Sequence, residues 1–171
     1  MDERCDATYF IGAHAMAGTL NGFLDHTQSS LTWYNYIVNG RRMGELAQWA
    51  MVAGNFGIPL VMVSGDEAAC MEAHGFFDPC KTAAVKRGVG RQRAEALPLD
   101  QARQRIWQAA KDAVSLVPHA QPFRPQKPME IITQFTRADY ADSAARGGGV
   151  DRIDARTVRK LTSDPLDLFP W

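Results

Sequence analysis

Two histidines and one glutamate in the first third of the sequence are of types that bind metal ions. His14 follows a short apolar segment, His26 lies in a polar stretch directly after Asp25, and Glu45 stands near the start of a predicted helix. Imidazole nitrogens and carboxylate oxygens are the usual ligands of a catalytic zinc ion. A basic side chain beside such a metal can also move protons. These residues are therefore candidates for a catalytic metal site.

Each of these residues also has a purely structural interpretation. A histidine directly after a strand, such as His14, is often only a hydrogen-bonded structural residue. Asp25 and His26 are ordinary turn residues, and an acid in the first turn of a helix, such as Glu45, offsets the helix dipole. The spacing of the residues alone leaves both interpretations open.

The elements that must position these residues follow from hydrophobic patterning. Residues 9–11 are bulky or β-branched and predict a short strand, and the polar, glycine-containing residues 18–30 predict a loop. Residues 31–38 predict a second strand, which the turn dipeptide at 39–40 closes. Apolar side chains recur with helical spacing over residues 43–56. The first histidine is thus expected at a strand end, the second in a loop and the glutamate in the first turn of a helix.

The rest of the sequence also alternates between strand and helix patterns, which predicts an α/β layer with some parallel pairing. Strands are expected at 60–63, 82–85, 129–135 and once more after Val150, and helices at 66–73, 100–117, 138–146 and 164–168. We predict a mixed sheet flanked by helices. Residues 1–118 are expected to form an incomplete α/β domain that carries the metal site. Residues 119–171 are expected to form a smaller α+β portion that packs on this domain or on a neighbouring subunit.

Three further groups of residues have competing interpretations. Residues 64–67, Ser-Gly-Asp-Glu, have the spacing of a capping box, and capping is favoured over a metal-ligand role. The basic residues within 86–93 are interpreted as a solvated face. Trp33, Tyr34 and Tyr36 are expected on alternating faces of their strand, as core and subunit contacts rather than as a ligand platform.

The composition is that of an ordinary globular domain, with 46% hydrophobic and 22% charged residues in a chain of 171. Lys+Arg and Asp+Glu both number 19, and the resulting zero net charge argues against a dedicated nucleic-acid-binding protein. The three cysteines lack C-x-x-C spacing and predict neither a disulfide framework nor a zinc knuckle. No apolar run is long enough for a membrane span, and the first residues do not form a signal peptide. We therefore expect a cytoplasmic protein with no membrane or nucleic-acid partner.

Several motifs in the sequence match one known family in order. They are GAHAMAGT at 12–19, HTQSS at 26–30, NGR at 39–41, GEL at 44–46, PLVMVSGDE at 59–67 and TAAVK at 82–86. Together they resemble the DppA-type D-aminopeptidases, which are metallopeptidases with a dinuclear zinc site. The resemblance runs from about residue 6 to the end of the chain. It implies a zinc-dependent aminopeptidase that hydrolyses short peptides with an N-terminal D-amino acid, such as D-Ala-D-Ala.

The resemblance also implies roles for single residues. His14 and Glu45 match ligands of one zinc ion, and His26 matches a histidine beside the metals that is assigned a catalytic role. Lys86 lies in the closely matching segment 82–86 and is a candidate for anchoring the carboxylate of a substrate peptide, as the alternative to a solvated face. Members of the family form large ring-like homo-oligomers, so self-association is expected as well.

One part of the family pattern has no counterpart in this sequence. The family carries an Asp-x-Glu-Gly motif near its N-terminus, whose aspartate bridges the two zinc ions, and a further histidine ligand follows it. Asp2 and Glu3 lack that spacing and the glycine. We therefore expect this chain to correspond to the C-terminal part of such an enzyme and to keep at most a partial zinc site. The alternative is a non-catalytic oligomerising or peptide-binding module that has lost the dinuclear site.

Overall fold

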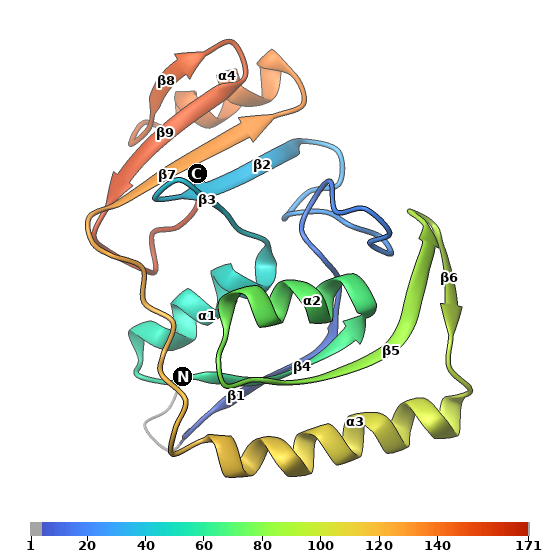
Figure 1. The fold of residues 1–171 in the computed structure, drawn as a ribbon. Coiled ribbons are helices and arrows are strands. Elements are labelled where there is room, and N and C mark those ends of the chain that lie inside the picture. The colour runs from blue at the N-terminus through green and yellow to red at the C-terminus, as the bar shows by residue number, and fades with distance from the viewer. Residues whose placement is uncertain (1–4, 171) are drawn as a thin grey trace.

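The strands of the protein form two separate sheets, as seen in a computed structural model that describes residues 5–170 (Figure 1). The first sheet has the order β1-β4-β5-β6. Strands β1 (Thr8–Ala13), β4 (Leu60–Asp66) and β5 (Lys81–Gly90) run parallel, and β6 (Arg93–Ala96) pairs antiparallel with β5. This is the mixed sheet that the sequence predicts. Asp2 and Glu3, which lack the spacing and the glycine of the family's Asp-x-Glu-Gly motif, lie outside the described residues.

Helices cover both faces of the first sheet. Helix α2 (Glu67–Phe76) lies on one face and α3 (Leu99–Ala113) on the other (Figure 1). Strand β4, which is buried along its whole length, lies between them, as expected for a continuous apolar run. Helix α3 was predicted to run to residue 117, but it ends at Ala113, and the chain continues as a 3-10 helix at Val114–Leu116.

The start of α2 differs from a capping box. Asp66 is the N-cap residue, and its Oδ1 accepts a hydrogen bond from the backbone N–H of Ala69 at 2.9 Å. Ser64 lies inside β4 instead, and its hydroxyl accepts a hydrogen bond from the backbone N–H of Gly12 at 3.3 Å. Capping therefore explains Asp66, but Ser64 is not part of it.

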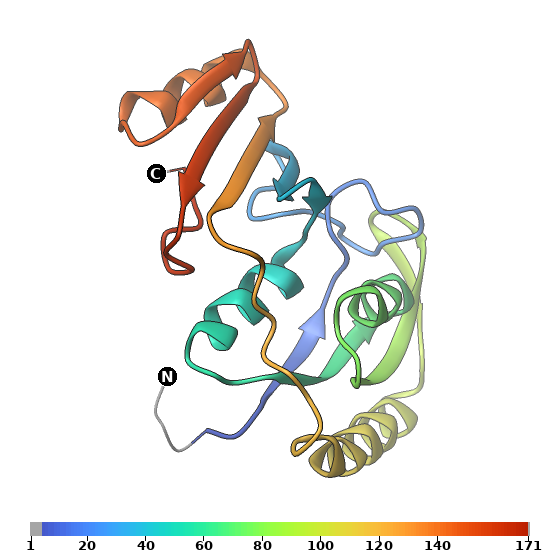
Figure 2. The same cartoon turned by 60° about the vertical axis from the view of Figure 1, so that its left-hand side comes forward.

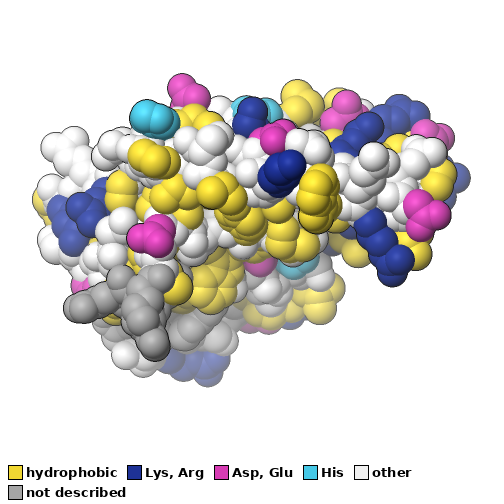
Figure 3. Space-filling model, turned by 90° about the horizontal axis from the view of Figure 1, so that it is seen from below, with side chains coloured by type: hydrophobic (Ala, Val, Ile, Leu, Met, Phe, Trp, Pro, Cys, Tyr) yellow, Lys and Arg dark blue, Asp and Glu magenta, His cyan; other side chains and the backbone are white. Residues whose placement is uncertain are grey.

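The outer face of α3 exposes several large apolar side chains. Leu99 and Trp107 of α3, and Val114 of the 3-10 helix that follows it, are each more than half exposed. Figure 3, seen from below, shows hydrophobic side chains on this face with charged side chains of both signs around them.

The second sheet is antiparallel and has the order β3-β2-β7-β9-β8. Its strands are β2 (Trp33–Val38), β3 (Arg41–Arg42), β7 (Met129–Phe135), β8 (Asp151–Asp154) and β9 (Thr157–Thr162). Helix α4 (Ala138–Arg146) packs beside β7 and β9 and adds Ala141 to the core. The strands come from both sides of residue 118, and the division of the chain at that residue stays a prediction.

Three expectations for the second sheet and the segment after it are wrong. The segment after Val150 forms two strands, β8 and β9, instead of one. They are joined by a turn in which Asp154 accepts a hydrogen bond from the Arg156 N–H. Residues 164–168 contain a turn instead of a helix. In β2, Trp33 and Tyr36 are both buried although they should lie on opposite faces. The reason is a register shift between Trp33 and Asn35 in the pairing with β7, which reverses the alternation.

Helix α1 (Glu45–Asn55) joins the cores of the two sheets (Figure 2). Leu46 and Ala50 pack with buried residues of β1, β4 and α2, whereas Ala47 and Met51 pack with the core of the second sheet. A helix with apolar side chains on two faces is held on both sides, so its N-terminus is fixed relative to both sheets. Among residues 5–170, no helix is long and apolar enough to cross a membrane.

Candidate metal centre

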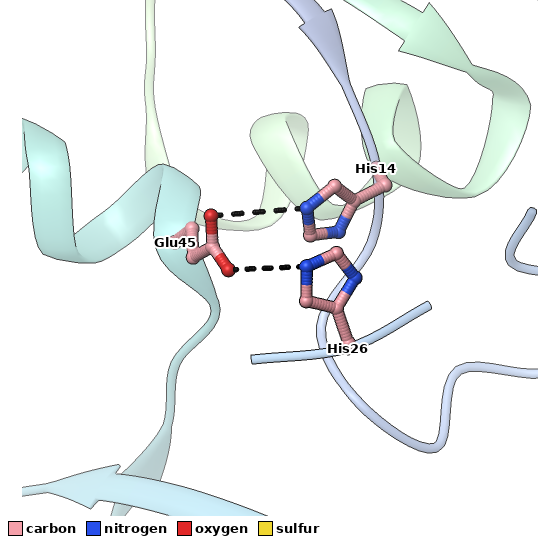
Figure 4. A group of neighbouring side chains, drawn as sticks. All are labelled: His14, His26 and Glu45. Carbon is pink, nitrogen blue, oxygen red and sulfur yellow. Dashed lines mark ion pairs between the residues drawn. The ribbon is translucent and has the colours of Figure 1, made fainter. Parts of the chain in front are cut away.

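The side chains of His14, His26 and Glu45 converge, as Figure 4 shows. His14 directly follows β1, His26 comes from the loop between β1 and β2, and Glu45 is the first residue of α1. His14 Nε2 lies 3.8 Å from Glu45 Oε2, and His26 Nε2 lies 3.6 Å from Glu45 Oε1. Among the described residues, His14, His26 and Glu45 form the group of side chains that could hold a metal ion. Each offers one ligand atom, and these three atoms lie within 4.8 Å of one another.

The backbone orients both imidazole rings in the same way. His14 Nδ1 lies 3.1 Å from the carbonyl oxygen of Ala15, and His26 Nδ1 lies 2.7 Å from that of Leu24. A carbonyl oxygen only accepts, so each Nδ1 carries a hydrogen, and Nε2 is the ring atom that faces the carboxylate. The rings stack with their centroids 3.9 Å apart. Where Nε2 carries no hydrogen, its lone pair and the carboxylate repel each other unless a proton or a cation lies between them.

The two oxygens of Glu45 have different surroundings. Oε1 accepts a hydrogen bond from the backbone N–H of Gln28 at 2.8 Å and faces His26, whereas Oε2 faces His14. Gln28 has a left-handed backbone conformation with φ of 59°, which is costly for a residue with a side chain and turns its N–H toward the carboxylate. Its side chain also donates to Gln48 of α1 at 2.7 Å. Gln28 thus fixes the carboxylate from the loop side.

The donor set fits a zinc ion. Two ligand atoms on one tetrahedral zinc ion lie about 3.3 Å apart, as follows from zinc-to-ligand distances of about 2.0–2.1 Å. The 3.8 Å separation between His14 Nε2 and Glu45 Oε2 is close to this value, and His26 Nε2 lies beside the same carboxylate, 3.6 Å from Oε1. The side chains are 20–29% exposed, so they are held by the protein and still reachable from solvent. Backbone carbonyls behind both rings are the usual supporting partners of metal-binding histidines.

The loop that carries His26 is anchored to the first sheet. The buried Asp66 carboxylate accepts a hydrogen bond from the backbone N–H of Phe23 at 2.6 Å through Oδ2. Asp25 accepts from the Gly18 N–H at 2.7 Å and pairs with Arg91 at 3.4 Å. Asp66 and Arg91 therefore position the loop, although the sequence indicated only a helix cap and a solvated face for them.

The structure places Lys86 on the neighbouring strand β5. Its ammonium group lies 4.9 Å from the centre of the Phe23 ring, in a cation-π contact with the same loop. It is not in the group formed by the two histidines and Glu45. Sequence reasoning missed Gln28 as a functional residue, because it acts through its backbone N–H and no side-chain type signals that role.

Comparisons with known proteins show which family the chain is similar to. The sequence profile of the D-aminopeptidase family matches residues 1–171. A D-aminopeptidase from Bacillus subtilis (strain 168) is 28% identical over 170 residues, which is 99% of this chain and 61% of the relative. Among solved structures, the Zn-dependent D-aminopeptidase DppA from Bacillus subtilis, a self-compartmentalizing protease, has a TM-score of 0.92 and 25% identity, covering 98% of this chain and 61% of that one. The chain thus spans less than two thirds of the length of these relatives.

Proposed function

This chain belongs to the D-aminopeptidase family, and we propose that it supplies a zinc-dependent site for hydrolysis of short peptides with an N-terminal D-amino acid, such as D-Ala-D-Ala. The observation that carries the proposal is the convergence of His14, His26 and Glu45, with the Nε2 atoms of both rings facing the carboxylate. Similarity to a Zn-dependent D-aminopeptidase supports the choice of metal and substrate.

We assign the metal to His14 and Glu45 and the proton transfer to His26. Glu45 Oε2 faces His14, while Oε1 is engaged by the Gln28 N–H. Zinc, when bound, supplies Lewis acidity toward a peptide carbonyl and toward water. The Leu24 carbonyl holds the Nδ1 hydrogen of His26, so Nε2 is the atom that accepts a proton from water and returns it to the leaving amine. Glu45 Oε1, 3.6 Å away, stabilises the imidazolium in between.

The described residues offer one such ligand group, so we propose that this chain holds one zinc ion by itself. A second ion, as the family resemblance implies, would need ligands from beyond this group. A bound peptide could meet Lys86 through its carboxylate, since the ammonium group lies against the loop that carries His26. We also propose that the protein forms homo-oligomers, because a relative is a self-compartmentalizing protease, and that it works in the cytoplasm with its three cysteines reduced.

Hydrolysis of D-Ala-D-Ala by the zinc-loaded chain tests the proposal. We expect release of D-alanine, no release of L-alanine from L-Ala-L-Ala, and loss of activity in His26→Ala with unchanged zinc content. Zinc binding without any hydrolysis would instead favour a non-catalytic peptide-binding module. Equal hydrolysis by His26→Ala would refute the role assigned to His26.

A further inference from the structure

Helix α2 carries a carboxyl group that reaches the segment after His14. Glu72, in the second half of the helix, accepts a hydrogen bond from the backbone N–H of Met16 through Oε2 at 2.7 Å. The two residues are 56 positions apart in the sequence, and Met16 is two residues after His14.

The same carboxyl group lies against the start of α1. A Cβ atom added to Gly44 would lie 2.6 Å from Glu72 Oε1 and 2.8 Å from the Cβ atom of Met16. Gly44 is the N-cap residue of α1 and directly precedes Glu45. The absence of a side chain at Gly44 therefore allows Glu72, Met16 and the helix start to pack closely.

Keeping an acid at this place is costly. Oε1 is buried and has no hydrogen-bond partner among residues 5–170. Burial raises the pKa of Glu72 to about 7; the Met16 N–H and Arg42 lower it, and Asp66 and Glu45 raise it. An apolar side chain would avoid the cost of burying this carboxyl group. The position of the acid is explained if its acceptor oxygen is needed at the Met16 backbone.

We propose that Glu72 is a positioning residue of the metal site, which fixes the backbone beside His14 against the helix start that carries Glu45. The inference rests on the zinc site proposed above. Loss of a group that supports metal ligands from behind typically lowers metal affinity roughly 10-fold to 100-fold. The acceptor oxygen, rather than the negative charge, makes the contact, so glutamine can replace glutamate whereas an apolar residue cannot.

The test is a titration of the metal-free chain with Co²⁺, followed through its visible absorption bands, for wild type, Glu72→Met and Glu72→Gln. We expect Glu72→Met to bind Co²⁺ about 10-fold or more weakly, with altered bands, and Glu72→Gln to bind like wild type. Tyr36→Phe is the matched control. It removes a buried hydrogen bond of 2.8 Å to the Leu168 carbonyl in the other core, so it lowers stability without touching the site.

The outcomes separate the two proposals. If Glu72→Met binds Co²⁺ as wild type does, with the same bands, the positioning role is refuted while the metal site stands. If Tyr36→Phe weakens Co²⁺ binding as much as Glu72→Met does, the effect is one of general stability and the positioning role is again refuted. If the wild-type chain itself binds no Co²⁺, the proposed metal site fails and the inference falls with it.

Discussion

Replacing Gly65 with alanine is expected to displace the end of β1 and with it His14. Gly65 of β4 pairs with Ala13 of β1, and a Cβ atom at Gly65 would lie 2.2 Å from the Ala13 carbonyl oxygen. An ordinary carbon-to-oxygen contact is about 3.3 Å or longer, so the two strands must separate by about 1 Å. Overpacking of this kind costs about 1–3 kcal/mol of unfolding free energy. Ligands tolerate displacements of only about 0.5 Å, so zinc affinity should fall at least about tenfold.

Two measurements on Gly65→Ala check this prediction. Urea unfolding of the metal-free chain gives the stability, and competition with a chromophoric chelator gives the zinc affinity. Gly75→Ala in α2 is the matched control, because a Cβ atom there meets nothing closer than the Arg41 side chain at 3.9 Å. It should raise stability by about 0.5–1 kcal/mol and leave zinc affinity unchanged. A Gly65→Ala variant as stable as wild type, with the same zinc affinity, would refute the reasoning.

Three further predictions concern the groups around the site. Asp66→Ala removes the acceptor of the Ala69 and Phe23 N–H groups and should cost at least about 2 kcal/mol in urea unfolding; a loss below 0.5 kcal/mol would contradict both contacts. Because the pKa of Glu72 rises from 4.5 to about 7 on folding, the folded chain binds more protons between these values. The unfolding free energy of the metal-free wild type minus that of Glu72→Gln should therefore be highest below pH 4.5. It should fall by about 3 kcal/mol as the pH rises through 7. A difference that does not change with pH would refute the raised pKa of Glu72. Zinc at 100 times its dissociation constant should stabilise the wild type by about 2.7 kcal/mol in thermal unfolding and His14→Ala not at all; equal stabilisation would place the ion elsewhere.

The elements with strong local patterns could be predicted from the sequence. The helical periodicity of α1 and the buried run of β4 are set by neighbouring residues, and α4 was expected with the bounds it has. Strands β3, β6 and β8 were missed or merged because they are short and mostly exposed, so only their partners define them. The separation into two sheets depends on contacts such as Trp33 with Phe135, which no local pattern contains.

The candidate site shows the same division. His14, His26 and Glu45 could be selected because their types and motifs point to zinc chemistry, and the structure brings all three together. Glu72 could not be found in this way, since its contact with Met16 joins residues 56 positions apart. Gln28 acts through a backbone N–H that depends on a left-handed conformation. Such supporting groups become visible only once the fold has placed them.

Zinc bound per chain at equilibrium tests the central claim most directly. Equilibrium dialysis of the metal-free chain against increasing free zinc, with elemental analysis of the protein, gives the number of sites and their affinity. We predict saturation at about one ion per chain, held at His14 and Glu45. We predict loss of that ion in both His14→Ala and Glu45→Ala. A wild-type chain that binds no zinc, or that binds two ions tightly, would contradict the claim.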